Sequence, residues 1–65
     1  MGVLTTLQSF RATRKLTQLE LALAIGVSRQ TINSIETGRF EPSLSLALKL
    51  SQYFNVPVEG LFALD

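Results

Sequence analysis

Apolar residues recur along this 65-residue chain at intervals of three and four, and short polar, glycine or proline segments separate the apolar stripes. This spacing is typical of amphipathic helices, and no stretch shows the alternation of a strand. The pattern predicts five helices, at about residues 3–14, 17–25, 28–37, 43–54 and 58–63. The expected fold class is therefore all-α, a compact five-helix bundle in a single domain that spans residues 1–65.

The predicted second and third helices follow each other closely. Thr17 and Glu20 have the spacing of a capping box, in which each side chain binds the other residue's backbone amide. Gly26 can take the left-handed conformation that ends a helix, and Ser28 can cap a new helix two residues later. The two helices must therefore cross steeply, and Ala22 is small enough for their point of contact.

Each predicted helix has one apolar stripe that faces inward. The residues expected in the core are Val3, Leu7, Phe10, Leu21, Ala22, Ile25, Ile32, Ile35, Leu44, Ala47, Leu50, Phe54, Leu61 and Phe62. A chain of this size buries only about 60% of the surface that its unfolded form exposes. We therefore expect a thin core and no deep substrate cavity.

The other side of the third predicted helix is rich in uncharged hydrogen-bonding groups. At 100° per residue, Arg29, Gln30, Asn33 and Thr37 lie opposite Ile32 and its neighbours, with Ser34 at the edge. Arginine matches guanine and glutamine or asparagine matches adenine through paired hydrogen bonds in the DNA major groove. The face is therefore a candidate for reading base edges, although an ordinary hydrated surface would also be polar.

Composition narrows the functional classes. The chain has no cysteine and no histidine, and it shows no cluster of carboxylates. Without these groups we expect no catalytic residues, no metal site and no cofactor, and hence no enzyme. No signal peptide and no apolar run of roughly 18 residues is present, so a cytoplasmic protein with no membrane contact is expected.

Charge is distributed unevenly although the net charge is only +1. Residues 11–39 carry five basic and two acidic side chains, whereas residues 40–65 carry one basic and three acidic ones. Such asymmetry would let the first part face a polyanion while the second faces away. Chance would also produce it in a chain with so few charges.

Three motifs, LTQ, GVSRQTI and IETGRFEPS, occur in order between Leu16 and Ser43. With them, the segment from Leu7 to Phe62 resembles the phage repressor and Cro type of helix-turn-helix domain, the xenobiotic-response-element family. The resemblance implies a lambda-repressor-like fold whose third helix enters the major groove of double-stranded DNA.

The same resemblance assigns roles to individual residues. It implies base reading by Arg29, Gln30, Asn33 and Ser34, and phosphate contacts by Thr17, Gln18, Thr37, Arg39 and, more weakly, Lys15. It also implies a partly buried structural ion pair between Arg11 and Glu36, which removes both from the base-reading set. Gln18, Arg39 and Lys15 could instead be ordinary hydrated residues.

An excess of apolar residues remains after the core is assigned. Leu19 and Leu23 lie on the outward face of the second predicted helix, where relatives usually have charged residues. A two-fold dimer would cover such residues, and the family favours the C-terminal region: the candidates there are Val58, Leu61, Phe62 and Leu64. Leu19 and Leu23 could instead bind a second protein, fold back on the core or be scattered without function.

These observations predict a sequence-specific DNA-binding transcriptional regulator. The expected form is a homodimeric repressor on a palindromic operator, with the DNA-binding domain making up the entire protein. The alternative is a protein-interaction module, such as an antitoxin, whose exposed apolar face binds a partner protein. RNA binding is less favoured because Phe10, Tyr53, Phe54 and Phe62 lie on core-type stripes and leave no stacking platform.

Overall fold

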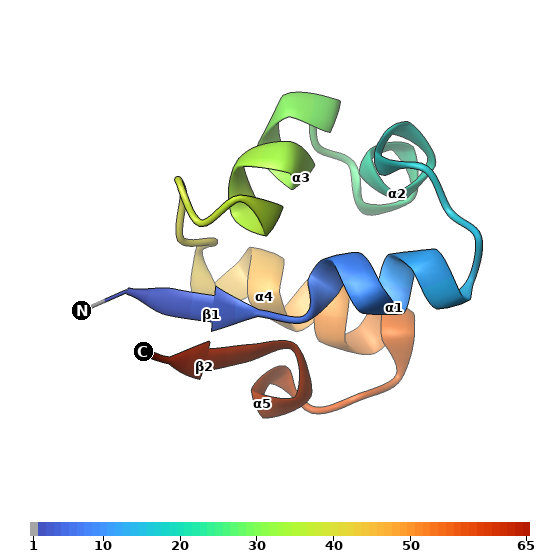
Figure 1. Ribbon diagram of the computed structural model, residues 1–65. Coiled ribbons are helices and arrows are strands. Elements are labelled where there is room, and N and C mark those ends of the chain that lie inside the picture. The colour runs from blue at the N-terminus through green and yellow to red at the C-terminus, as the bar shows by residue number, and fades with distance from the viewer. Residues whose placement is uncertain (1) are drawn as a thin grey trace.

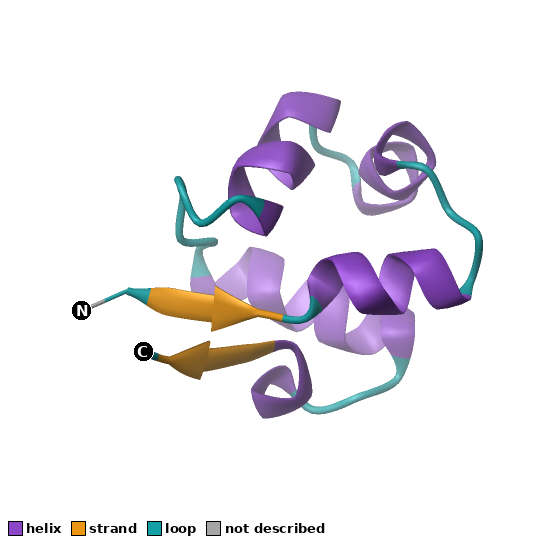
Figure 2. Ribbon diagram, viewed as in Figure 1, coloured by secondary structure: helices purple, strands orange, loops and turns teal. Residues whose placement is uncertain are grey.

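The computed structural model describes residues 2–65, and Met1 of the predicted domain lies outside them (Figures 1 and 2). Within this range the elements in chain order are β1 (Val3–Thr5), α1 (Leu7–Thr13), α2 (Gln18–Ile25), α3 (Arg29–Glu36), α4 (Leu44–Phe54), α5 (Val58–Leu61) and β2 (Phe62–Leu64). The five predicted helices are present, so the mainly helical fold class is confirmed. None of these helices is long and apolar enough to cross a membrane.

The three central helices begin at the residues that their sequence predicts. Thr17 and Glu20 form a complete capping box at the start of α2, and the Ser28 and Ser43 side chains accept backbone amides at the starts of α3 and α4. Gly26 ends α2 with φ +91°. These local signals need only neighbouring residues, so the sequence alone specifies them.

The ends of the chain differ from the prediction. Residues 3–5, predicted as helix, form β1, and Phe62 and Ala63, also predicted as helix, belong to β2. The strands pair antiparallel, with Val3 opposite Leu64 and Thr5 opposite Phe62.

The threonines at the start of the chain stabilise this sheet. The Thr5 hydroxyl donates to the carbonyl of Leu61 at 2.8 Å and accepts the Leu7 amide, and the Thr6 hydroxyl donates to the carbonyl of Gly60 at 2.8 Å. Because Leu61 and Gly60 are more than 50 residues from these threonines, helical periodicity could not reveal this pairing.

The core lies between the helices, and each of the five helices in residues 2–65 contributes to it. Its members are Leu7, Leu21, Ala22, Ile25, Ile32, Ile35, Leu46, Leu50, Phe54 and Leu61. In α4, Leu46 is buried and Leu44, which was predicted to face inward, is 74% exposed, so that assignment was wrong. At 100° per residue, Leu44 lies about 100° from the centre of the buried stripe of Leu46, Ala47, Leu50 and Phe54, so it faces solvent.

Arg14 contacts the C-terminal end of α4. Its two terminal nitrogens donate to the carbonyls of Tyr53 and Phe54 at 3.1 and 3.2 Å, and its guanidinium lies 4.9 Å from the centre of the Phe54 ring. These carbonyls have no amide partner within the helix, because they belong to its last turn. Arg14 therefore stabilises the C-terminus of α4 and links it to α1.

The turn between α2 and α3 yields a stability prediction. Gly26→Ala should lower the free energy of unfolding by about 1–2 kcal/mol, because a residue with a Cβ is strained in the left-handed conformation. A Cβ at Gly26 would meet none of residues 2–65 within 4 Å, so the backbone conformation alone would cause the loss. Urea unfolding measures it.

Gly60→Ala is the matched control, since Gly60 lies in α5 without a positive φ and its Cβ would make an ordinary 3.6 Å contact with Val56. We expect no loss of stability there. Equal losses in the two variants would contradict the role given to the turn.

Candidate nucleic-acid interface

The helix α3 carries a different kind of residue on each of its sides. Ile32 and Ile35, 0% and 2% exposed, fix one side in the core. Arg29 and Gln30 are exposed on another side, and Ser34 is half-buried. The helix is therefore held by its apolar side while a polar side remains open to solvent.

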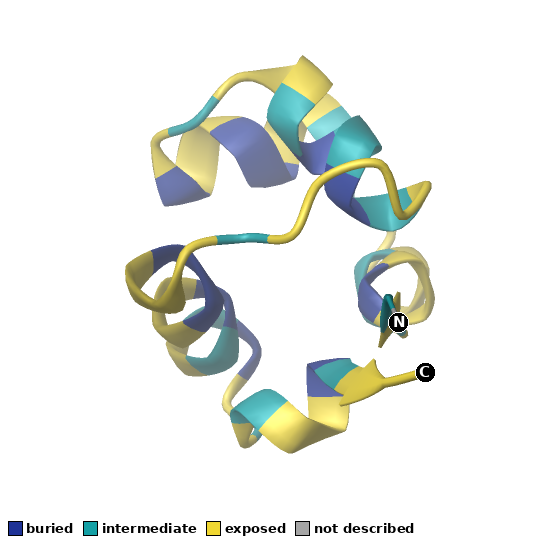
Figure 3. Ribbon diagram, turned by 90° about the vertical axis from the view of Figure 1, so that its left-hand side faces the viewer, coloured by how far each residue is buried: buried dark blue, intermediate teal, exposed yellow. Residues whose placement is uncertain are grey.

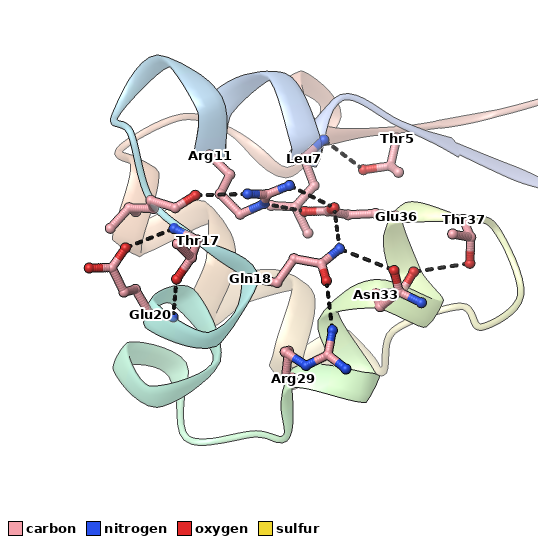
Figure 4. Close-up of polar contacts among 11 residues, drawn as sticks. Thr5, Leu7, Arg11, Thr17, Gln18, Glu20, Arg29, Asn33, Glu36 and Thr37 are labelled. Carbon is pink, nitrogen blue, oxygen red and sulfur yellow. Dashed lines mark hydrogen bonds and ion pairs between the residues drawn. The ribbon is translucent and has the colours of Figure 1, made fainter.

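A carboxylate at the end of α3 joins three helices (Figure 4). Glu36 Oε2 lies 2.8 Å from Arg11 Nε of α1, and Glu36 Oε1 accepts from Arg11 Nη2 at 3.2 Å and from Gln18 Nε2 of α2 at 3.0 Å. The ion pair between Arg11 and Glu36 is thus present, and Gln18 extends it. We call these three residues the Glu36 network.

Burial makes these contacts important for the fold. The Glu36 side chain is 4% exposed and that of Arg11 is 15% exposed. The hydrogen bonds that Arg11 donates to Glu36 raise the pKa of the Arg11 guanidinium above its ordinary value, although burial opposes the shift. Arg11 Nη1 also donates to the carbonyl of Leu16 at 2.7 Å, which holds the connection between α1 and α2.

Gln18 carries the network toward the exposed side of α3. Its Nε2 also donates to Asn33 Oδ1 at 3.1 Å, and its Oε1 accepts from Arg29 Nη1 at 3.4 Å. Two of the predicted base readers, Asn33 and Arg29, therefore contact a predicted phosphate residue. Figure 4 shows the Gln18 amide in contact with both side chains.

The predicted base readers differ in how many of their hydrogen-bonding groups remain unused within the protein. Within residues 2–65, neither Gln30 nor Ser34 makes a side-chain hydrogen bond, whereas the Asn33 side-chain oxygen accepts from Gln18 and Asn33 is half-buried. Gln30 and Ser34 have their full hydrogen-bonding capacity available. Asn33 has part of its capacity committed to the protein.

The predicted phosphate contacts also differ. Thr17 caps α2 with its hydroxyl, and the Thr37 hydroxyl donates to the carbonyls of Asn33 and Ser34 at 3.0 and 3.3 Å. Arg39 and Lys15 are exposed, and among the described residues their side chains form no hydrogen bond or ion pair. Lys15 adopts φ +57°, which the sequence pattern did not reveal.

The predicted partner surface needs one correction. Leu61 is 1% exposed and belongs to the core, so its side chain is not accessible to a partner. Leu19, Leu23 and Leu64 are 52%, 73% and 74% exposed, and Val58 and Phe62 are half-buried. The Leu61 side chain is buried because it packs in the core cluster, to which α1, α2, α3 and α4 also contribute.

Similar proteins include curated regulators of close to the same length. A family model described as helix-turn-helix matches residues 7–61. An uncharacterized HTH-type transcriptional regulator of Methanocaldococcus jannaschii is 50% identical over 56 residues, which cover 86% of this chain and 85% of that protein. Another, from Archaeoglobus fulgidus, is 44% identical over 61 residues, which cover 94% of this chain and 86% of that protein.

Solved structures share the same fold. The restriction-modification controller protein C.AhdI from Aeromonas hydrophila matches with a TM-score of 0.75 and 28% identity, over 83% of this chain and 78% of that one. The SOS-response transcriptional repressor LexA from Eubacterium rectale matches with a TM-score of 0.78 and 39% identity, over 83% of this chain and 57% of that one.

The Glu36 network predicts a strong coupling between two residues. Arg11→Met or Glu36→Gln alone should each lower the free energy of unfolding by about 3 kcal/mol, because each leaves the partner's buried polar group without its counterpart. The double variant should lose less than the sum of the single losses. Thermal and urea unfolding of the four proteins measure this difference.

Glu41→Gln serves as the control for loss of an acidic residue, since Glu41 is exposed and forms no ion pair among the described residues. Its stability should stay within about 0.5 kcal/mol of the parent. Additive losses in the double variant would show that Arg11 and Glu36 act independently.

Proposed function

Because the chain belongs to the Cro/C1-type family of helix-turn-helix transcriptional regulators, we propose that it binds double-stranded DNA sequence-specifically through α3. The main support is the open polar side of this helix. Gln30 and Ser34 have free hydrogen-bonding groups there, and Arg29 is exposed beside them. Such side chains match the donors and acceptors of base edges in the major groove.

The Glu36 network would orient this polar side. Gln18 links α2 to Asn33 and Arg29, so the start of α2 and the exposed side of α3 are held together. In this proposal Arg29, Gln30 and Ser34 contact bases, and Asn33 acts mainly by positioning Gln18. The start of α2 at Thr17 and Gln18, together with Thr37, Arg39 and Lys15, contacts the phosphates.

We further propose that two copies bind a palindromic operator and repress transcription by occupying it. A two-fold dimer places two α3 helices in successive major grooves about 34 Å apart. The exposed Leu64 and the half-buried Val58 and Phe62 near the C-terminus support this arrangement. Action on chromosomal DNA implies a cytoplasmic protein.

Selection of binding sites from a random double-stranded DNA pool tests the proposal. We expect an enriched inverted repeat whose half-site centres are about one helical turn apart. Enrichment of a single, unrepeated half-site would contradict the dimer and retain the DNA-binding role. A folded protein that enriches no sequence would contradict specific recognition itself.

Gln30→Ala should weaken binding to the selected site by about 1–3 kcal/mol and relax the preference at one base pair. The reason is that its exposed amide can satisfy the edge of only one base pair. Titration of the variant against the selected site and against single-base changes measures both effects. Gln52→Ala, an exposed glutamine on α4, is the matched control and should bind as the parent does.

Arg39→Ala should weaken binding to all sequences by a similar factor and reduce the slope of log affinity against log salt by about 0.9. A phosphate contact carries no base preference and releases one counterion. Lys49→Ala, an exposed basic residue on α4, is the matched control. A loss limited to one sequence would instead identify Arg39 as a base reader.

A further inference from the structure

Phe40 is an aromatic residue in an unusual place. It lies in the connection between α3 and α4, which is exposed from Thr37 to Glu41 (Figure 3). Its side chain is 47% exposed, whereas the other four aromatic residues are buried or half-buried. Phe40 does not belong to the core or to the residues packed against it, so packing of the interior does not explain it.

Phe40 forms one side of a surface hollow of about 230 Å³. The other lining residues are Ser28, Gln30, Thr31 and Ser34, all from α3 or its N-cap. The hollow therefore lies on the side of α3 that holds the free groups of Gln30 and Ser34. Among the described residues no charged side chain lines the hollow, so it offers a phosphate no cation.

The chemistry of the hollow suggests what could occupy it. The Phe40 ring provides apolar surface, and Gln30 and Ser34 provide hydrogen-bond donors. In the major groove, the 5-methyl group of thymine is the one apolar group on a standard base edge, and it lies next to the O4 acceptor. A hollow with an apolar wall and neighbouring donors complements both groups.

We propose that this hollow receives the 5-methyl group of a thymine and that Phe40 is the residue that distinguishes thymine from other bases there. The inference rests on the proposed function, since it requires α3 to lie in the major groove. Phe40 covers the methyl group, and Gln30 or Ser34 donates to O4 of the same base. Phe40 thus adds specificity from outside the reading helix.

Removal of single methyl groups from the DNA tests this subsite directly. In the selected operator, each thymine is replaced in turn by deoxyuridine, which removes only the methyl group, and the affinity of the 65-residue chain is measured. We expect one position in each half-site where the replacement weakens binding roughly fourfold, the value for one buried methyl group. The other thymines should show little change.

Protein variants assign the effect to Phe40. Phe40→Ala should bind thymine and deoxyuridine operators with nearly equal affinity, while Phe40→Leu should keep most of the difference because it keeps an apolar wall. Leu44→Ala is the matched control, since Leu44 is an exposed apolar residue that does not line the hollow. Thermal unfolding of Phe40→Ala should match the parent, because Phe40 is not part of the core.

The outcomes separate this inference from the proposed function. An unchanged thymine preference in Phe40→Ala, or no thymine whose methyl group matters, would reject the subsite while specific DNA binding stands. Failure to enrich any operator would reject both. A fourfold loss at one position that disappears only in Phe40→Ala would establish the subsite.

Discussion

The carboxylate of Glu36 is the interaction on which the arrangement of the helices depends. It is nearly fully buried, and it is stable there only because Arg11 and Gln18 satisfy both of its oxygens. Each of these residues belongs to a different helix, so an error in the position of any one helix would leave a buried charge unpaired. Burial of apolar surface has no preferred direction, whereas these hydrogen bonds hold their atoms at set distances and angles.

The same contacts give the residues of α3 separate roles. Ile32 and Ile35 attach the helix to the core, Glu36 and Asn33 set its orientation, and Gln30 and Ser34 remain free. The residues that hold the helix and those that can contact a ligand are therefore neighbours in sequence but distinct in role. The free residues can vary without loss of the fold, which is how one scaffold can serve many DNA sequences.

Most of the fold could be predicted from the sequence because its signals are local. The caps at Thr17, Ser28 and Ser43 and the glycine at position 26 depend on residues a few positions away. The terminal sheet and the contact of Arg14 with the end of α4 depend on residues far apart in the chain. The outward side of α3 was predictable from helical geometry, whereas the bond between Asn33 and Gln18 required the positions of two helices.

The short sheet brings the two ends of the described chain together, beside each other in Figure 1. Pairing residue 3 with residue 64 closes almost the whole chain into one loop, and this closure carries a large entropic cost until the helices have packed. We therefore expect the strands to join after α2 and α3 during folding. In the folded protein the same two strands should exchange their amide hydrogens before the central helices do, so the ends can open while the polar side of α3 stays in place.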